Sequence, residues 1–267
     1  MATYVSALVL LGVVLIPLLW IVSTAFKPPG EVFASPPLLV PRKPTLQNFH
    51  QVVTGQFGTY FLNSLLVASA SALAAVALGL MASFSFSRTR LYGRDTLLTV
   101  LIVTQLLPQV VLLVPIYRTA ASLGFVDTYY GLVMAYLAFQ LPVAVWLLRG
   151  FIASVPRDIE EAARIDGASE WGAFVRVVVP LARPGVVATA CYVFFSAWQD
   201  FMYALVFMTS QNHFTVPLGM LALIGEHTIQ WGLLMAASVL VLLPVVILFG
   251  ALQRQFIYGL AQGAVKG

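Results

Sequence analysis

Five of the ten carboxylate residues in this chain lie in one short stretch, between Asp158 and Glu170. Carboxylates at this density can accept charge-assisted hydrogen bonds from arginine and lysine side chains of another protein. No histidine, cysteine or lysine stands among them that would build a metal site or a nucleophile. The chemistry that this stretch indicates is therefore recognition of a soluble partner.

The same stretch carries the local signals of a helix. Pro156 suits a first helical turn, and Asp158 and Glu160 place negative charge near the positive end of the helix dipole. Gly167 is a natural left-handed stop. We therefore predict a helix from Pro156 to Asp166. Two interpretations stay open from this pattern: an amphipathic helix lying on a surface, or a docking helix whose alanines let a partner groove approach closely.

A second short helix is predicted after Gly167. Ser169 can cap it, it spans Glu170 to Val179, and Pro180 is expected to end it. Ion pairs at i, i+4 are expected within the first helix, namely Arg157 with Glu161 and Glu160 with Arg164.

Several catalytic chemistries find no support in the sequence. None of the three lysines follows a glycine-rich run of the kind that cradles nucleotide phosphates, so this chain is not expected to hydrolyse ATP. The three histidines lack metal-ligand spacing and a nearby serine nucleophile. The single Cys191 is expected to be structurally buried. We predict no catalytic residue, no metal site and no cofactor bound by this chain.

A second set of candidate residues is polar or aromatic and stands within or beside apolar segments. We therefore predict that these groups line a path through the apolar segments. For Asp200 a structural role, either capping a loop or pairing with another chain, is at least as open as contact with a transported molecule. The candidates are Asn63, Gln105, Gln109, Gln140, Trp198, Gln199 and Asp200.

The elements that must position these residues are membrane spans. The chain has 267 residues, of which 60% are hydrophobic and 9% charged, and no soluble domain of this length has such a composition. A span needs about 20 mostly apolar residues. We predict an all-α membrane protein with six transmembrane helices: Tyr4 to Thr24, Tyr60 to Phe86, Leu97 to Tyr117, Tyr130 to Leu148, Gly185 to Met208 and Leu233 to Leu252.

The distribution of basic residues predicts the orientation. Short cytoplasmic loops collect Lys and Arg, and placing both termini in the cytoplasm puts ten of the fourteen on that side. The net charge of +4 then reflects topology rather than a nucleic-acid partner. Residues 1–267 are expected to form a single transmembrane domain with a cytoplasmic loop at 149–183. The proline-rich segment from Lys27 to Thr59 is expected to be an extended outer cap.

Small residues recur every four positions along the second span, at Ser71, Ala75, Gly79 and Ser83. A stripe of this kind lets a neighbouring helix approach closely in lipid, so we expect it to be a packing face.

The loop motif resembles that of a known family. The pattern E-A-A-x-x-x-G, followed nine residues later by I-x-L-P, is typical of the membrane subunits of bacterial ATP-binding-cassette importers. Here it runs Glu161-Ala162-Ala163, Gly167 and then Val177 to Pro180, with valine at the isoleucine and leucine positions. Three other segments look like the maltose-type second permease of the sugar-importer branch: Phe61 to Ser64, Ala197 to Phe201, with Gln199 where asparagine is common, and Gly259 to Gly267.

The resemblance implies an assembly. Two permease chains form the pore in the bacterial inner membrane, two ATPase subunits bind ATP and magnesium beneath them, and an extracytoplasmic solute-binding protein delivers the cargo. Sugars are commonly held by amide or carboxylate hydrogen bonds and aromatic stacking, and in the maltose case the resemblance suggests that the other permease holds the sugar. The tail from Gln262 to Gly267 resembles family tails that reach toward the ATPase pair. The residues implied to couple this chain to its ATPase are Glu160, Glu161, Ala162, Ala163, Asp166, Gly167 and Pro180.

The function expected from these observations is that of a sugar-importer permease subunit, which is not itself an enzyme. One alternative keeps the importer and changes the cargo to glycerol phosphate, a polyol or another small solute. Scarce Lys and Arg in the spans argue against an anionic cargo bound by this chain. The other alternative is a self-sufficient secondary transporter, for which Asp200 alone is a poor supply of coupling groups.

Overall fold

The computed structural model of the protein describes residues 2–89, 92–224 and 229–264, and the side chains of this set from residue 3 to residue 251. Across these residues every regular element is helical, and an isolated bridge joins Ile224 to Ile229. Four helices are long and apolar enough to cross a membrane, or up to six if each of two bent helix pairs is one span. The predicted all-α, six-span class is confirmed. Part of the tail from Gln262 to Gly267 lies outside the described residues.

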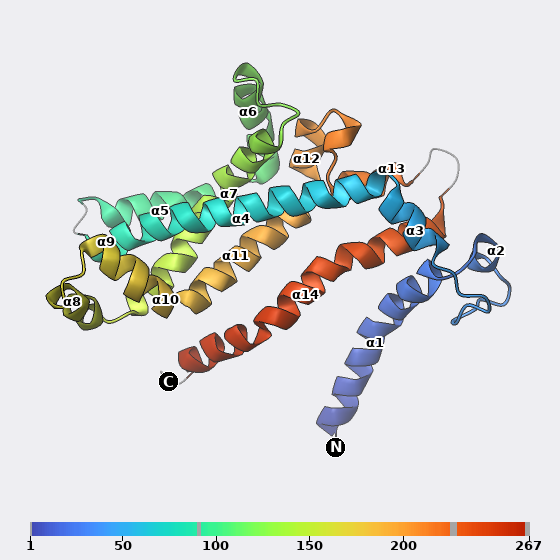
Figure 1. Ribbon diagram of the computed structural model, residues 1–267, viewed down its shortest axis with the longest axis horizontal. Helices are drawn as coiled ribbons and strands as arrows, with labels where there is room; N and C mark the ends of the chain where they lie inside the picture. Colours follow the sequence, from blue (N-terminus) through green and yellow to red (C-terminus); the bar gives the residue numbers. More distant parts are fainter. Residues whose placement is uncertain (1, 90–91, 225–228, 265–267) are drawn as a thin grey trace. The chain divides into compact units, whose positions relative to one another are not determined.

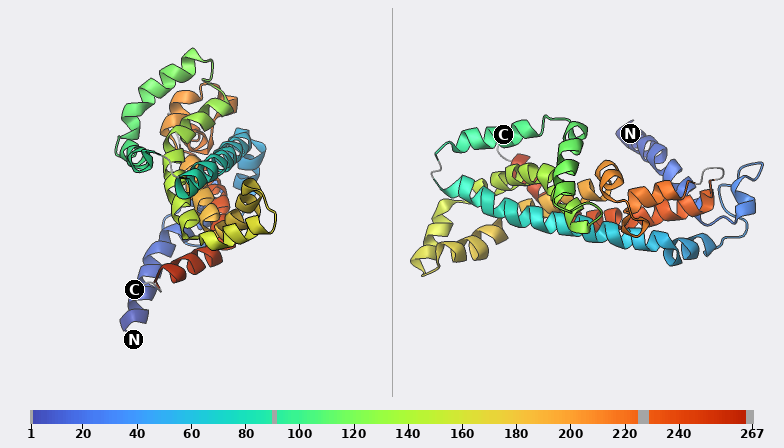
Figure 2. Two further views of the ribbon diagram at one scale, coloured as in Figure 1. Left: turned by 90° about the vertical axis from the view of Figure 1, so that its left-hand side faces the viewer. Right: turned by 90° about the horizontal axis from the view of Figure 1, so that it is seen from above.

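The chain separates into two compact units, drawn in Figures 1 and 2. Unit 1 comprises residues 1–63 and 214–247, and unit 2 comprises residues 64–213 and 248–267. The helices of unit 1 are α1 (Ala2–Ala25), α2 (Pro29–Val32), α3 (Gln47–Thr54), the start of α4 (Gln56–Arg88), α13 (Val216–Ala222) and most of α14 (Trp231–Ala264).

Asparagine side chains join the segments of unit 1. The Asn48 amide donates to the carbonyls of Ala25 and Lys27, both at 2.9 Å, and the Asn63 amide donates to the carbonyl of Phe214 at 2.9 Å. The expectation of an extended cap from Lys27 to Thr59 is wrong in part, because α2, α3 and the start of α4 lie inside it. The prolines cluster before residue 45, so the segment that follows is free to form helices.

Unit 2 is built around α7 (Tyr129–Ser154). The side chains of Leu132, Ala144, Leu148 and Ile152 on this helix are fully buried. The other elements of the unit are the rest of α4, α5 (Arg94–Thr104), α6 (Gln109–Ser122), α8 (Arg157–Ile165), α9 (Glu170–Ala173), a π-helix (Phe174–Val178), α10 (Val179–Leu181), α11 (Arg183–Trp198), α12 (Met202–Phe207) and a 3₁₀ turn (Gln211–His213).

The small-residue stripe of α4 is the packing face that its spacing predicts. Ser71, Ala75 and Ser83 are fully buried. A Cβ atom at Gly79 would lie 3.0 Å from Leu148 Cδ1 and 3.4 Å from Ala144 Cβ on α7. Van der Waals contact between closely approaching helices is a main source of association in lipid, and at Gly79 the stripe brings α4 against α7.

The terminal helices are apolar on all sides. None of the most apolar 18-residue window of α1 is buried, and only 17% of the corresponding window of α14 is. An all-apolar helix that exposes its side chains suits a hydrocarbon surrounding, where the backbone hydrogen bonds are satisfied internally. These helices therefore have the surface expected of lipid-facing spans.

Two predicted spans are not single straight helices. The span predicted from Leu97 to Tyr117 consists of α5 and α6, bent by 100° at a short break. Pro108 begins α6 with an extended backbone, φ −60° and ψ 125°, and its ring excludes continuation of the preceding helix. Continuous hydrophobicity hides such a break, although the proline itself marks it.

The span predicted from Gly185 to Met208 is interrupted by residues 199–201, between α11 and α12. Asp200 explains the interruption, because its Oδ1 accepts from the backbone N–H groups of Tyr203 at 3.0 Å and Ala204 at 3.3 Å and so starts a new helix. The other predicted spans are confirmed, and α4, α7 and α14 extend beyond their predicted ends.

The charged loop with α8 and α9 lies at one end of unit 2, and the α6–α7 connection lies at the other (Figures 1 and 2). They flank the two ends of α7, which has 26 residues. At about 1.5 Å per residue this helix is about 39 Å long, enough to cross a bilayer. The two ends of unit 2 are thus separated by a full membrane thickness.

Candidate functional site

The helix predicted in the charged loop is present. α8 runs from Arg157 to Ile165, with Pro156 and Asp166 as the flanking cap residues. Gly167 follows with φ +92°, the left-handed conformation predicted from its type and position. Local signals were sufficient here because each of them acts within one helical turn.

The inner side of α8 is fixed by a buried ion pair. Arg88 Nε, at the end of α4, lies 2.8 Å from Glu160 Oε2, and the two side chains are 8% and 5% exposed. The same guanidinium donates through Nη2 to the carbonyls of Val155 at 2.9 Å and Ile152 at 3.2 Å. Arg88 therefore ties the loop helix to the ends of both α4 and α7.

One of the two expected i, i+4 pairs is present. Glu160 Oε1 lies 3.4 Å from Arg164 Nη2. Arg157 does not pair with Glu161, and its Nη2 donates instead to the carbonyl of Ser87 at 3.0 Å. A long-range carbonyl partner near the end of α4 thus replaces the local one.

The outer side of α8 is exposed and carries both charge and apolar surface. Glu161 and Ala162 are exposed, and Ile165 is 86% exposed. Trp171, on the following turn, is 58% exposed. Exposed large apolar residues beside carboxylates, at the end of a helix bundle, are typical of a surface that a partner covers.

The second helix of the loop differs from its prediction. The Ser169 hydroxyl accepts from Gly172 N, as expected for its cap, but α9 gives way to a π-helix at Phe174. Pro180 does not end the helix as predicted. It stands in the first turn of α10, where its missing N–H needs no partner, and the break comes at Ala182 instead.

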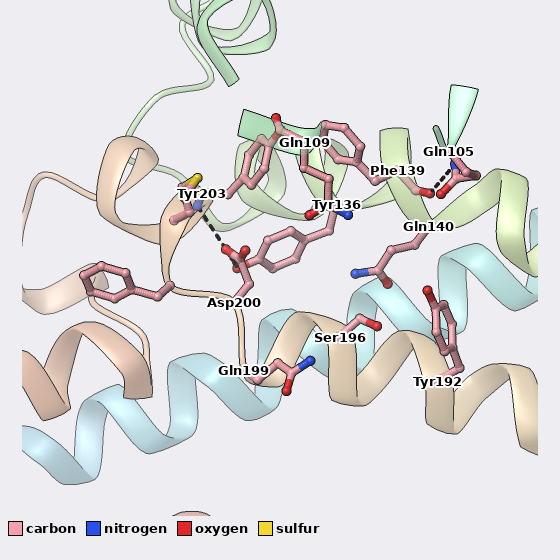
Figure 3. A pocket seen from close by; sticks show the side chains of 12 residues that line it. Gln105, Gln109, Tyr136, Phe139, Gln140, Tyr192, Ser196, Gln199, Asp200 and Tyr203 are labelled. Atoms are coloured by element: carbon pink, nitrogen blue, oxygen red, sulfur yellow. Dashed lines mark hydrogen bonds between the residues drawn. The ribbon is translucent and has the colours of Figure 1, made fainter. Parts of the chain in front are cut away.

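Five of the seven predicted path residues line one cavity in unit 2, of about 580 Å³. Gln105 and Gln109 flank the α5–α6 break, Gln140 comes from α7, and Gln199 and Asp200 follow α11. The remaining lining residues are Tyr136, Phe139, Tyr192, Ser196, Phe201, Met202 and Tyr203 (Figure 3). The volume falls within the range of small-molecule sites, about 300–1,000 Å³.

The other two predicted path residues lie elsewhere. Asn63 is buried in unit 1 and bonds to the carbonyl of Phe214. Trp198 is 4% exposed and stacks on Phe194, with ring centroids 5.7 Å apart and an interplanar angle of 14°. The structure therefore does not bring these two side chains to the cavity.

Asp200 is braced from two sides. Besides the two backbone N–H groups of α12, its Oδ1 accepts from the Tyr136 hydroxyl at 2.9 Å. Tyr203 in turn donates through its hydroxyl to the carbonyl of Gln109 at 2.9 Å. Asp200 therefore has the structural role of capping the start of α12, through its Oδ1 atom. The same carboxylate also lines the cavity.

Gln140 differs from the other lining amides. It is 8% exposed, and its Oε1 atom has no hydrogen-bond partner among the described residues. Gln105, by contrast, donates through Nε2 to the carbonyl of Phe139 at 3.1 Å. Gln140 extends from α7 toward α11, from which Ser196 and Tyr192 point back (Figure 3).

Sequence reasoning missed several lining residues that helical spacing could have found. Tyr136 is four residues before Gln140, on the same face of α7. Tyr192 and Ser196 stand seven and three residues before Gln199, on one face of α11. The predicted set contained mainly amides and a carboxylate. It therefore omitted the tyrosine and serine hydroxyls that lie on the same faces of α7 and α11.

The sequence matches a known family over most of its length. Residues 75–260 match the family described as binding-protein-dependent transport system inner membrane component. The trehalose/maltose transport system permease protein MalG of Thermococcus litoralis is 34% identical over 267 residues, which cover 98% of this chain and 95% of that protein. The diacetylchitobiose uptake system permease protein DasC of Streptomyces coelicolor is 34% identical, covering 98% and 96%.

The fold is also that of solved transporters. A bacterial ABC transporter involved in the import of the acidic polysaccharide alginate has a chain that matches with a TM-score of 0.82 at 18% identity, covering 95% of this chain and 94% of that one. The methionine ABC transporter MetNI, in inward-facing conformations, matches with a TM-score of 0.55 at 15% identity. The chain therefore belongs to the binding-protein-dependent transport system inner membrane components, as a multi-pass permease of the ATP-binding-cassette importers.

Proposed function

We propose that this chain is one of two permease subunits in an ATP-driven importer of sugars of the oligosaccharide or disaccharide class. It forms half of the translocation pore and takes its cargo from an extracytoplasmic solute-binding protein. Two separate ATPase subunits bind ATP and magnesium, because this sequence has no phosphate-binding loop. Residues 1–267 act as one permease domain, with 149–183 as its cytoplasmic coupling loop and both termini in the cytoplasm.

One observation carries the coupling role. α8 is fastened on its inner side by the Arg88–Glu160 pair and left exposed on its outer side. A helix held in this way can pass a displacement to α4 and α7, since Arg88 also bonds to carbonyls at the end of α7. Coupling between an ATPase contact and a transport path requires a rigid element whose position affects both of them. The fastened helix α8 is such an element.

The proposed contact surface for the ATPase is the exposed side of the loop. Glu161 offers a carboxylate for charge-assisted hydrogen bonds, and Ala162 leaves room for a groove wall to approach. Gly167 turns the chain so that α9 folds back beside α8. The coupling residues proposed from the sequence are Glu160, Glu161, Ala162, Ala163, Asp166, Gly167 and Pro180, and among them Glu160 acts from the inner side.

The sugar cargo rests on two supports. Relatives at 34% identity include permeases named for trehalose/maltose and diacetylchitobiose transport. The cavity in unit 2 is lined by amides, hydroxyls and aromatic rings, the groups that hold carbohydrates. No Lys or Arg lines it, which disfavours glycerol phosphate as a cargo held by this chain.

Affinity purification of the tagged chain from its native membrane in mild detergent tests the assembly. Wild type is expected to retain a P-loop ATPase and a second permease. Gly167→Trp is expected to lose the ATPase and keep the second permease. The matched control is Gly124→Trp, because Gly124 also has a left-handed backbone, φ +72°, and open space around it, at the other end of unit 2. A wild-type chain that purifies alone would contradict the proposal.

A further inference from the structure

The cavity of unit 2 contains a buried polar group that the fold itself does not use. The Gln140 side chain is more than nine-tenths buried, and its Oε1 atom has no partner among the described residues. Buried polar groups are nearly always hydrogen-bonded, so an unmatched acceptor in a cavity marks a place where another molecule donates. Gln140 points into this cavity, toward Ser196 and Tyr192 (Figure 3).

The depth of this group fits a transport site. Gln140 stands eleven residues after Tyr129, the first residue of α7. At about 1.5 Å per residue it lies about 16 Å along a helix of about 39 Å, close to the middle of this span. Many secondary transporters bind their substrates near the midplane, where interrupted helices line a cavity, and the same geometry can serve an importer. Two such interruptions, at residues 105–108 and 199–201, border this one.

The chemistry of the lining selects the cargo. Amides and hydroxyls come from four elements, and the rings of Tyr136, Phe139 and Tyr192 supply flat apolar faces. A glycoside has both hydroxyl groups and an apolar ring face, and this lining matches both. No lining residue is cationic, and Asp200 would repel an anion. The lining is therefore suited to an uncharged sugar and unsuited to a phosphate or uronate.

We infer that this chain itself holds the transported solute during its passage, as an uncharged glycoside in this cavity, with the Gln140 amide as the central hydrogen-bonding group. This inference rests on the proposed function. Ser196 and Tyr192 bind the solute from α11. Asp200 and Tyr136 brace the cavity wall through their mutual hydrogen bond, so they act as positioning residues.

The test is uptake into proteoliposomes that contain the complete transporter, with its solute-binding protein present. The probes are radiolabelled maltose, trehalose and diacetylchitobiose, and glycerol 3-phosphate serves as the charged comparison. Gln140→Leu keeps an uncharged side chain of comparable volume and removes the amide. Ser196→Ala removes a hydroxyl from the facing helix. The matched control is Ser71→Ala, which removes a fully buried hydroxyl from the packing stripe of α4, outside the cavity.

Gln140→Leu is expected to lower the uptake efficiency of the transported sugar roughly tenfold and to change the ratio of uptake rates among the three sugars. Ser196→Ala is expected to change the same ratio by a smaller factor. ATP hydrolysis stimulated by the loaded binding protein persists in both. Ser71→Ala leaves the ratio as in wild type. If these side chains only supported packing, their replacement would not change the ratio of uptake rates among the sugars. If the Gln140→Leu transporter fails to assemble, the ratio measured with Ser196→Ala tests the inference instead.

Two negative results are distinguishable. If wild type imports a sugar, and neither cavity variant changes efficiency or selectivity beyond the Ser71→Ala control, this inference is overturned and the importer stands. The cavity would then be filled by the second permease. If wild type imports none of the three sugars but takes up glycerol 3-phosphate, the proposed sugar function fails, and the inference fails with it.

Discussion

Glu160 and Glu161 are adjacent, yet the fold gives them opposite tasks. Glu160 points inward to Arg88, and Glu161 is exposed on the outer side of α8. The sequence alone could not separate them, because the Arg88 partner is 72 positions away along the chain. Burial, which depends on the packing of α8 against the end of α4, makes the distinction.

The ion pair of Glu160 predicts a local loss of stability. Removing one partner of a buried pair leaves an uncompensated charge and costs about 3–5 kcal/mol. Glu160→Ala is expected to lower the free energy of opening of α8 by this amount, as measured by hydrogen exchange of the amides of Arg157–Ile165. Glu161→Ala, at an exposed site, is the control and is expected to change it by less than about 0.5 kcal/mol.

The same two variants also separate the stability of α8 from its binding to the ATPase. Glu161→Ala is expected to weaken retention of the ATPase during purification while α8 remains protected. Replacing both members of the inner pair, Arg88→Met with Glu160→Met, removes both buried charges together and is expected to recover most of the protection lost in Glu160→Ala. No recovery in the double variant would show that the pair does not act as the fastening of this helix.

At the scale of elements, Asp127 clasps two loops at the end of unit 2 away from α8. Its carboxylate accepts from the backbone N–H groups of Thr209 at 3.0 Å and Ser210 at 2.9 Å and from the Ser210 hydroxyl. His213 Nδ1 lies 3.2 Å from the same carboxylate. Burial alone would raise the pKa of Asp127, but these hydrogen bonds and the His213 ring together lower it well below its usual value.

Because the pKa of Asp127 is lowered in the folded state, the hydrogen bonds that it accepts from Thr209 and Ser210 are expected to weaken in acid. Its contribution is fully present above the pKa of the unfolded chain, about 3.9, and is lost as the pH falls toward the folded pKa. Protection factors of the Thr209 and Ser210 amides, corrected for intrinsic exchange, are expected to be constant from about pH 5 to 8 and to fall below about pH 4. Asp127→Asn, which tolerates the same left-handed backbone, should have lower protection and no such fall. An unchanged pH profile in this variant would contradict the assignment.

The contact between α7 and α11 depends on one glycine. A Cβ atom at Gly185 would lie 2.2 Å from Phe151 Cγ, so any side chain there must displace the ring. Gly185→Ala is expected to destabilise the protein by about 1–3 kcal/mol, measured as a lowered thermal midpoint in detergent. Gly150→Ala, where nothing lies within 4 Å, is the control and should leave the midpoint unchanged or slightly raised. Equal midpoints for the two variants would exclude a close α7–α11 contact.

The elements show which features a sequence carries locally. The bounds of α8, the turn at Gly167 and the cap at Ser169 were predictable, because each depends on residues within a few positions. The breaks before α6 and α12 were missed because each lies within an otherwise apolar stretch, although Pro108 and Asp200 mark their positions. Most polar lining of the cavity was found from residue type, whereas Tyr192 and Ser196 required the face of α11 to be considered as a whole.

At the scale of the whole molecule, the chain is one component of a multi-subunit transport system. It supplies a loop helix, α8, with an exposed outer side at one end of unit 2 and a polar cavity near the middle of its central helix. It supplies no phosphate-binding loop, and Asp200, whose Oδ1 carries three hydrogen bonds within the fold, is a poor carrier for a coupling ion. Under the proposed function, the energy for transport enters through α8.

The most direct measurement is the driving force of uptake in proteoliposomes that contain this chain with its co-purified subunits. Radiolabelled sugar is expected to accumulate only when ATP is available to the ATPase subunits and the solute-binding protein is on the opposite side. Dissipating proton and sodium gradients should leave accumulation unchanged. Accumulation by this chain alone, driven by an ion gradient without ATP, would contradict the account and identify a secondary transporter.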